Sequence, residues 1–280
     1  MKYNVLHPKN SQLNKKSEYD PIYNPEKLFP IPRDEMRKGL GINPLQLPFY
    51  GFDLWNHYEV SWLDKEGKPV VFLAEIIYGC DSPNMIESKS MKLYFNSFNN
   101  TQFKDSDSVK NILKEDLEKN VGAEVFVNII PLYDGKNNIF FKKFDGKCLD
   151  RLVVSCTIYT VDPSLLFTEN DIVEETLFSD LLKSNCLVTH QPDWGSIEIS
   201  YKGKKINHEG LLKYIVSFRN HNEFHEQCIE RIFLDIMNQC NPRELTVHGR
   251  YTRRGGVDIN PYRSTNKIDH FKKNIRLCRQ

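Results

Sequence analysis

One cysteine stands apart because of the sequence around it. Cys186 lies in a polar segment, residues 184–195, which also contains His190 and Asp193 and leads into a predicted strand. A thiolate is a strong nucleophile, but an ordinary thiol has a pKa of ~8.5 and needs a nearby base or cation. His190, Asp193 or the more distant His225 could supply that help. The alternative is a buried, inert thiol, and the polar segment favours the nucleophile.

A second polar group stands at a predicted helix start. Phe224, His225 and Glu226 precede an apolar repeat in residues 229–237 that has the spacing of a helix. The first turn of a helix carries unpaired N–H groups, so Glu226 could simply stabilise the helix, by up to ~1 kcal/mol. Alternatively, its carboxylate could accept hydrogen bonds from the N–H edge of a purine-like base.

Two further segments have side chains suited to phosphate. Residues 87–94, ESKSMKLY, combine an acid, two serines and two lysines, although a charged surface would look the same. Residues 250–256, RYTRRGG, place arginine side chains beside two glycines whose bare backbone can approach phosphate oxygens. The sequence has neither a Gly-x-Gly-x-x-Gly fingerprint nor a Walker loop, so we expect any nucleotide to bind outside a Rossmann unit.

The composition describes a globular chain of one large domain or two ordinary ones. The 280 residues include 38 Lys and Arg against 37 Asp and Glu, and 40% are hydrophobic. A net charge of +1 gives no strong field, so tight sequence-independent binding to nucleic acid or to an anionic membrane is not expected. We therefore expect a small-molecule partner.

The cysteines and the apolar runs indicate a cytoplasmic protein. Seven scattered cysteines without a Cys-x-x-Cys pair fit neither a disulfide framework nor a zinc ribbon. The longest apolar run, residues 70–74, is far shorter than the ~20 residues of a membrane helix. No apolar segment of a secretory signal follows Met1. We expect no membrane span.

Several elements are predicted for the first half of the chain. Residues 1–45 show no sustained period and are expected to form an extended arm, with structure proper beginning near Leu47. A helix is predicted around residues 109–117, with Ser106 or Ser108 as its N-cap and Gly122 as its end. The predicted strands are 58–62 and 70–78, which form a hairpin, followed by 124–132 and 152–159.

The second half repeats this order. A strand at 196–201, a turn at Gly203, a helix ending before Pro242 and a strand at 245–251 are predicted. The pattern Y-x-x-S-F-x-N occurs at residues 94–100 and again at 214–220, an offset of 120 residues. We therefore predict an α+β fold of two tandem modules, residues 46–160 and 161–280.

Together, these segments resemble the NADPH-dependent 7-cyano-7-deazaguanine reductases, the nitrile reductases of queuosine biosynthesis. Residues 87–94 match that family's signature, E-[SL]-K-[SA]-hydrophobic-K-L-aromatic, at every position. Cys186 with Asp193 seven residues later, then residues 224–226 and 253–256, match the other landmarks in order. The resemblance covers about residues 47–263 and looks like the bimodular form of the family.

The resemblance implies a tunnelling fold and a homodimer. Each of two tandem copies would have an antiparallel sheet with paired helices on one face. The first copy lacks the cysteine and the His-Glu pair, and the second lacks the signature, which implies one composite site for each pair of modules.

The resemblance also implies a mechanism and its residues. Cys186 would attack the nitrile carbon to form a thioimide, and Asp193 would assist proton transfer. A nitrile is a poor hydride acceptor, whereas the protonated C=N group that follows thiolate addition accepts hydride readily. Two NADPH molecules would be consumed. The implied substrate-binding residues are Ile86, Glu87, Ser88, His225 and Glu226, and the implied NADPH-binding residues are Ser88, Lys89, Arg254 and Gly255.

Three other functions remain open at this point. A zinc-dependent GTP cyclohydrolase of the same fold would use Cys186, His190 and Cys228 as ligands, although Cys228 lies on a predicted helix. A cofactor-free thiol amidase would need only the nucleophile and its base. A non-catalytic purine- or tRNA-binding module would leave Cys186 inert.

Overall fold

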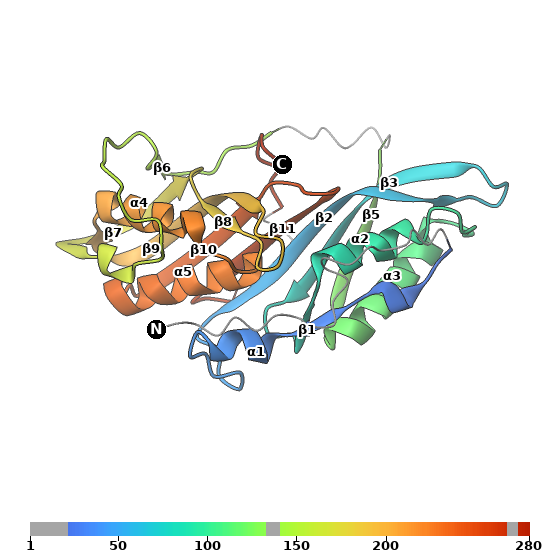
Figure 1. Cartoon of the computed structure of the whole chain (residues 1–280), viewed down its shortest axis with the longest axis horizontal. Helices are drawn as coiled ribbons and strands as arrows, with labels where there is room; N and C mark the ends of the chain where they lie inside the picture. The colour runs from blue at the N-terminus through green and yellow to red at the C-terminus, as the bar shows by residue number, and fades with distance from the viewer. Residues whose placement is uncertain (1–21, 133–140, 268–273) are drawn as a thin grey trace. The chain divides into compact units, whose positions relative to one another are not determined.

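The chain folds into two units, which are described separately. A computed structural model describes residues 22–132, 141–267 and 274–280 (Figure 1). Unit 1 comprises Met1–Gln46, Asp53–Ile139 and Arg253–Asp258, and unit 2 comprises Leu47–Phe52, Phe140–Thr252 and Ile259–Gln280. Each unit therefore takes a short segment from the half of the chain that mainly forms the other. The module boundary expected at residues 160 and 161 stays a prediction.

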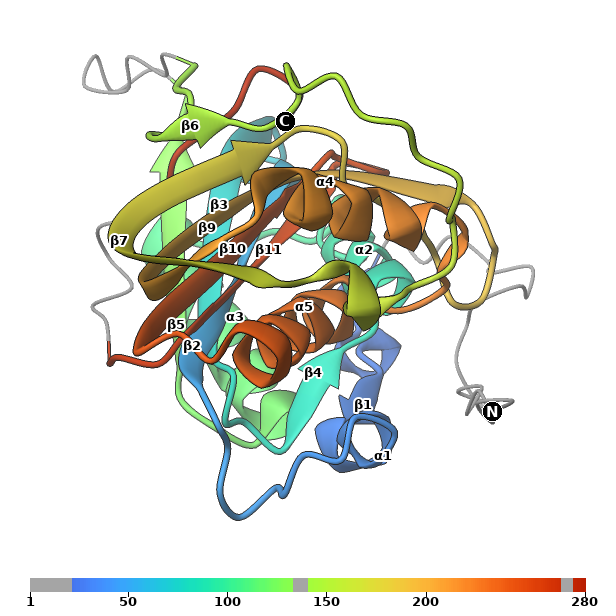
Figure 2. The ribbon, with the colours of Figure 1, turned by 90° about the vertical axis from the view of Figure 1, so that its left-hand side faces the viewer.

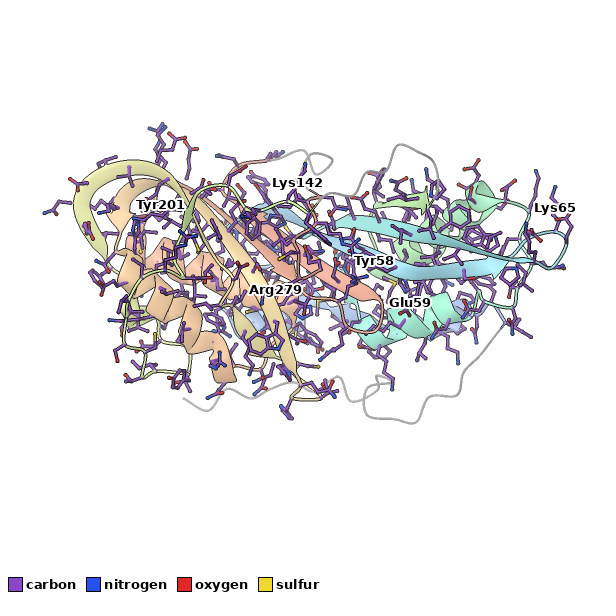
Figure 3. All side chains as sticks on the ribbon, turned by 90° about the horizontal axis from the view of Figure 1, so that it is seen from above. Tyr58, Glu59, Lys65, Lys142, Tyr201 and Arg279 are labelled. Atoms are coloured by element: carbon purple, nitrogen blue, oxygen red, sulfur yellow. The ribbon has the colours of Figure 1, made fainter. Side chains whose placement is uncertain are left out.

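Unit 1 is built on a three-stranded antiparallel arrangement. Its order is β5-β3-β2, with β2 at Tyr50–Leu63, β3 at Pro69–Gly79 and β5 at Val125–Pro131. The predicted hairpin and the strand after it are confirmed. The hairpin turns at Gly67, whose φ of 80° favours glycine, and Figure 3 shows Lys65 at the tip, away from Tyr58.

Two helices connect β3 to β5 in unit 1. They are α2 (Ser88–Asn96) and α3 (Ser106–Val121). The apolar repeat of α3 is buried, and Gly122 ends the helix in the left-handed conformation as predicted. The N-cap differs from the prediction. It is Asp105, whose Oδ1 accepts from the Ser108 N–H at 2.8 Å, because a carboxylate there reaches the orphan N–H groups of the first turn.

Unit 2 repeats the same order of strands and helices. Figure 2 shows α4 and α5 together on one side of its strands. The strand order is β11-β10-β9-β7-β6, and the short β8 also pairs with β9. The bounds are β6 Lys147–Cys148, β7 Thr168–Ser179, β8 Lys183–Asn185, β9 Pro192–Ile206, α4 His208–Ser217, α5 His225–Cys240, β10 Glu244–Tyr251 and β11 Val257–Ser264.

Alternation along β9 shows which face of this sheet is covered. Ile197 and Ile199 are buried, whereas Ser200 and Lys202 on the opposite face are partly exposed. A Cβ on Gly249, which pairs with Ile197, would lie 2.6 Å from Cδ1 of a helix α5 isoleucine. Helix α5 therefore covers the apolar face. The predicted strands at 196–201 and 245–251 and the helix ending before Pro242 are confirmed.

Matched hydrogen bonds support the predicted duplication. In unit 1 the Tyr94 hydroxyl donates to Asp116 at 2.6 Å, and in unit 2 the Tyr214 hydroxyl donates to Asp235 at 2.6 Å. Each bond joins the first helix of a pair to the second, at an offset of 119 to 120 residues. The predicted α+β fold with two tandem modules is confirmed.

The N-terminal segment is more regular than expected. Residues 22–45 contain a 3-10 turn (Pro25–Lys27), strand β1 (Pro30–Pro32) and helix α1 (Arg33–Lys38), and β1 pairs with β4 (Asn84–Ile86). The six residues of α1 are too few to show a helical period, and a buried ion pair between its first residue and Asp53 anchors it. Residues 1–21 lie outside the described residues.

Two other local predictions are wrong. Residues 152–159 are not a strand, and Val153 is fully exposed. Their β-branched side chains favour a strand only where a neighbouring strand pairs with them. Gly203 is not a turn, because β9 continues through it and pairs it with Val173. A Cβ there would lie 2.9 Å from Pro242 Cα, so this glycine permits a close approach.

Candidate active site

The predicted catalytic residues of unit 2 lie on adjoining segments. Strand β8 pairs with the start of β9, placing Ser184 opposite Asp193. Cys186 follows β8 directly, and its N–H donates to the Gln191 carbonyl at 2.8 Å, which closes a tight loop. Cys186 and Asp193 are 8% and 7% exposed. The local hairpin therefore brings the thiol and the carboxylate to the same end of the strand pair.

The segment before α5 lies against the same hairpin. The Asn185 N–H donates to the His221 carbonyl at 2.7 Å, and the Glu223 N–H donates to the Asn185 carbonyl at 3.2 Å. These bonds place the start of α5 beside the residue that precedes Cys186. His225 is the first residue of the helix, and its Nε2 lies 3.4 Å from Asp193 Oδ2.

His225, rather than His190, faces the predicted proton-transfer residue. His190 is exposed, and its Nδ1 lies 3.2 Å from the Asn222 side-chain oxygen. The imidazole of His225 is stacked on Tyr251, with ring centroids 4.0 Å apart. His225 thus contacts both Asp193 of β9 and Tyr251 of β10.

The start of α5 favours a binding role for Glu226. Phe224, the N-cap residue, makes no side-chain capping hydrogen bond. Glu226 is in the first turn and only 3% exposed. A surface acid would interact with the helix dipole equally well, whereas burying a carboxylate carries a desolvation cost. Burial is therefore the observation that distinguishes Glu226 from an ordinary helix-start acid.

Sequence reasoning missed two neighbours of these residues. Tyr251 and Lys183 reach the site from β10 and β8. Burial and then the Arg219 charge lower the pKa of Lys183, and the nearby Asp193 carboxylate opposes that shift. Lys183 belongs to no recognisable motif, and Tyr251 lies in the segment 250–256, whose arginines and glycines suggested phosphate binding instead.

The signature residues lie in unit 1 at the start of α2. Glu87 is the N-cap, and it accepts from the N–H groups of Lys89 at 2.7 Å and Ser90 at 2.9 Å. Burial raises the pKa of Glu87, and the two N–H groups oppose that shift. Ile86 and Glu87 are buried, and Ser88 is partly exposed. The structure shows a capping role for Glu87, and its contact with substrate stays a prediction.

All four predicted cofactor residues also lie in unit 1. Ser88 and Lys89 open α2, and Arg254 and Gly255 belong to the short segment Arg253–Asp258. Gly255 has a φ of 61°, and a Cβ on it would lie 2.8 Å from Lys92 Nζ. The backbone of Gly255 lies beside a lysine side chain of α2, and such a surface is suited to the phosphates of a dinucleotide. These residues therefore fit the predicted cofactor.

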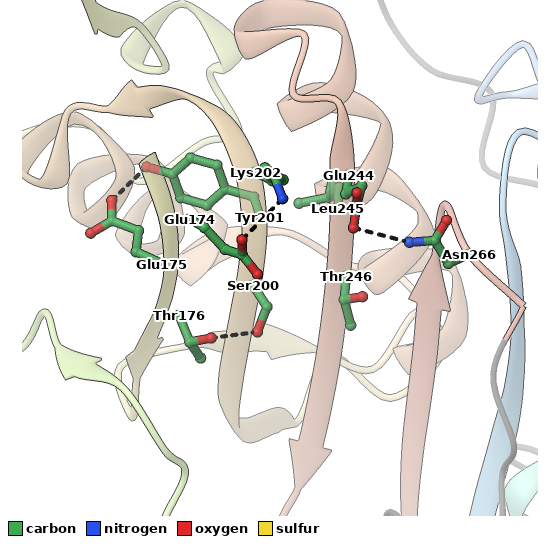
Figure 4. A pocket seen from close by; sticks show the side chains of 10 residues that line it. All are labelled: Glu174, Glu175, Thr176, Ser200, Tyr201, Lys202, Glu244, Leu245, Thr246 and Asn266. Atoms are coloured by element: carbon green, nitrogen blue, oxygen red, sulfur yellow. Dashed lines mark hydrogen bonds and ion pairs between the residues drawn. The ribbon is translucent and has the colours of Figure 1, made fainter. Parts of the chain in front are cut away.

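A metal-ligand cluster and a surface pocket are two other kinds of site to consider in the described residues. Among residues 22–132, 141–267 and 274–280, no three His, Cys, Asp or Glu side chains group closely enough to hold a metal ion. A pocket of about 220 Å³ on β7, β9 and β10 contains none of the predicted site residues (Figure 4). Its polar groups largely bind one another, as Thr176 and Ser200 do at 2.9 Å. In the described part of the chain, no helix is long and apolar enough to cross a membrane.

Comparison with known proteins identifies the family. A family described as "Nitrile reductase, 7-cyano-7-deazaguanine-reductase N-term" matches residues 19–129, and one described as "QueF-like protein" matches residues 192–270. A protein of Legionella pneumophila (strain Corby), named NADPH-dependent 7-cyano-7-deazaguanine reductase, is 60% identical over 96% of this chain and 95% of its own length. The chain belongs to the 7-cyano-7-deazaguanine reductase family.

Two other members of this family show that the similarity is not confined to one genus. A protein of the same name from Polaromonas sp. (strain JS666 / ATCC BAA-500) is 53% identical over 98% of this chain and 99% of its own length. Another from Coxiella burnetii (strain CbuK_Q154) is 54% identical over 94% of both chains. The first family match contains the α2 signature, and the second contains Asp193, His225 and Glu226. Cys186 lies between the two matched ranges.

Proposed function

We propose that this protein is an NADPH-dependent 7-cyano-7-deazaguanine reductase. It reduces the nitrile to the aminomethyl group of 7-aminomethyl-7-deazaguanine, in the biosynthesis of queuosine. Support comes from relatives of that name, which match over nearly the whole length of the chain. The structural observation that carries the proposal is the contact between His225 and Asp193, at 3.4 Å, beside the loop of Cys186.

The proposed chemistry begins with Cys186. Its sulfur forms a bond to the nitrile carbon while the thiol proton leaves and the nitrile nitrogen gains a proton, giving a neutral thioimide. Asp193 accepts the first proton and donates the second, so no net charge is created. The burial of both side chains supports this role, because an enclosed site protects an imine-like intermediate from water.

Recognition of the base is assigned to the start of α5. The carboxylate of Glu226 accepts hydrogen bonds from the N–H groups of the deazaguanine, and His225 contacts its heterocycle. Charge-assisted hydrogen bonds in a buried setting give both affinity and selectivity. Ile86, Glu87 and Ser88 are proposed as further substrate contacts, through the backbone and side chains at the start of α2.

NADPH is proposed to bind to unit 1. It supplies hydride when bound, and reduction of a nitrile to an amine takes two such equivalents. Lys89 and Arg254 bind its phosphates, the Ser88 hydroxyl donates to them, and Gly255 lets the backbone approach. Positive φ at Gly255 and the Lys92 ammonium beside it support this assignment.

The cellular setting follows from the same resemblance. We propose a homodimer in the cytoplasm that acts on a free small molecule and binds no nucleic acid directly. The net charge of +1 supports the last point.

A coupled assay tests the proposal. Purified protein, 7-cyano-7-deazaguanine and NADPH are mixed, absorbance at 340 nm is followed, and the aminomethyl product is quantified. We expect two NADPH oxidised per product and none without the nitrile. Absence of NADPH oxidation, or hydrolysis of the nitrile without it, would contradict the proposal.

A further inference from the structure

Tyr251 occupies a central place beneath the start of α5. It is the last residue of β10 and pairs with Gly195 of β9. Its ring is fully buried and lies against the imidazole of His225, with centroids 4.0 Å apart and planes inclined by 26°. This is a face-to-face contact, which restrains the plane of the imidazole as well as its position.

Two glycines make room for the Tyr251 ring. A Cβ on Gly195 would lie 3.2 Å from both Cδ1 and Cε1 of Tyr251, and a Cβ on Gly249 would lie 3.4 Å from Cε2. A side chain at position 195 would press on the ring, whereas a Cβ at position 249 would only come into van der Waals contact with it. The ring therefore rests on bare backbone and presents its face to His225.

The hydroxyl end of Tyr251 points to the remaining segments of the site. It lies near the thiol of Cys228, one turn after His225, and near the hydroxyl of Ser184, which stands opposite Asp193. Burial, and then the neighbouring Cys228, raises the pKa of Tyr251 well above its ordinary value, so the phenol stays neutral. One side chain thus touches α5, β8 and β9, the elements that carry or directly precede His225, Cys186 and Asp193.

We propose that Tyr251 is a positioning residue, which holds the imidazole of His225 with Nε2 toward Asp193. A histidine at the first position of a helix has two free side-chain torsions, and the stack fixes both. Asp193 and Gly195 are two residues apart on one face of β9, so the ring that rests on Gly195 sets the distance from His225 to Asp193. The reaction that this orientation serves rests on the proposed function.

A matched pair of substitutions separates the ring from the hydroxyl. Tyr251→Phe keeps the stack, and Tyr251→Leu removes it. The measured quantity is the rate of thioimide formation on Cys186 without NADPH, followed by mass spectrometry across pH. We expect Tyr251→Phe to stay within about threefold of the wild type and Tyr251→Leu to be at least about tenfold slower with a shifted pH profile. Equal rates for Leu and the wild type would overturn the proposal.

A double substitution distinguishes positioning from general destabilisation. If Tyr251 acts through His225, then Tyr251→Leu should slow the reaction less than about twofold further in a His225→Ala background. The same tenfold loss in both backgrounds would overturn the proposal. Tyr251→Met, which fills more of the space, repeats the comparison if the leucine variant does not fold.

A substrate-free measurement keeps this inference separate from the proposed function. The stacked Tyr251 ring should move the His225 ring-proton resonances upfield, and this shift should persist in Tyr251→Phe and disappear in Tyr251→Leu. An unchanged resonance in the leucine variant would overturn the proposal even if the enzyme is active. Wild-type protein with this shift but no thioimide would instead contradict the proposed function.

Discussion

The two units begin the second helix of each pair in different ways. In unit 1, Asp105 caps α3 with a side-chain hydrogen bond, whereas in unit 2 the equivalent Phe224 gives α5 no such cap. The residues that follow Phe224 are a partly buried histidine and a buried glutamate. A cap contributes about 1 kcal/mol to a helix. One copy has therefore kept that contribution, and the other has a histidine and a buried glutamate at the same place, to which we assign recognition of the substrate.

The first helix of each pair is capped in both units, and the units differ in the side chain that follows the cap. Glu87 and Asn207 cap α2 and α4 in the same manner, each accepting an N–H three residues on at 2.9 Å. The turn after the cap then carries Lys89 in α2 and Glu209 in α4. Equivalent positions therefore present a cation in unit 1 and an acid in unit 2. This difference agrees with the proposed function, in which phosphate binding and nucleophilic chemistry belong to different copies.

The largest expected effect belongs to the nucleophile of unit 2. Cys186→Ala should reduce turnover at least about 10⁴-fold, because no other group can form the thioimide. The melting temperature should stay within a few degrees of the wild type. Steady-state NADPH oxidation and thermal unfolding measure the two quantities, and the exposed Cys278→Ala serves as the control. Near-normal turnover of Cys186→Ala would break the assignment of chemistry to this unit.

The next effect concerns the uncapped helix. Glu226→Ala should weaken binding of the deazaguanine by about 3 kcal/mol, or more than 100-fold in Kd, because its N–H groups lose a charged acceptor. Calorimetry in a Cys186→Ala background avoids covalent reaction. Glu209→Ala removes an exposed first-turn acid from α4 and should leave the Kd unchanged. Equal Kd values for the two variants would show that Glu226 only stabilises the first turn of the helix and does not bind the substrate.

Removal of the N-cap side chain of α3 should change the stability of the protein and leave its substrate affinity unchanged. Asp105→Ala should lower the free energy of unfolding, because the N–H of Ser108 loses its acceptor, with no change in the Kd for substrate. Urea denaturation measures the loss, and Asp107→Ala, an exposed acid in the same turn, is the matched control. A loss of substrate affinity in Asp105→Ala would remove the contrast between the two helix starts.

The smallest expected effect is the difference between two substitutions of the duplicated tyrosines. Tyr214→Phe should cost about 1.5 kcal/mol, since Asp235 is partly buried and loses its tyrosine donor. Tyr94→Phe should cost about 0.5 kcal/mol less, because Asp116 keeps a second donor, the Tyr23 hydroxyl at 2.6 Å. The two losses are measured by urea denaturation. A greater loss for Tyr94→Phe would show that the matched bonds are not equivalent.

The sequence predicted those elements whose conformation is determined by residues close to one another in the chain. The apolar repeats of α3 and α5 and the hairpin turn at Gly67 are set within a few residues, so the sequence reveals them. Strand β11 was missed because Asp258 and Asn260 look like loop residues. They are buried, and distant partners such as Asn56 and Gln280 bind them.

The same distinction applies to the candidate site. Cys186 and Asp193 stand in one short polar segment, and His225 begins a recognisable helix, so the sequence singles out all three as candidates. It does not single out Tyr251 for this site, because the proposed role of Tyr251 depends on Gly195, 56 residues earlier, and on a ring contact with another element. Pairing between distant strands determines such neighbours, and a single sequence does not show that pairing.

Mass spectrometry of the nitrile-treated protein tests the central claim most directly. Protein incubated with 7-cyano-7-deazaguanine without NADPH should gain the full mass of the substrate on the peptide that contains Cys186. Addition of NADPH should then discharge the adduct, and Cys186→Ala should never form it. An adduct on another cysteine, or turnover with no adduct on Cys186, would contradict the assignment of the nucleophile.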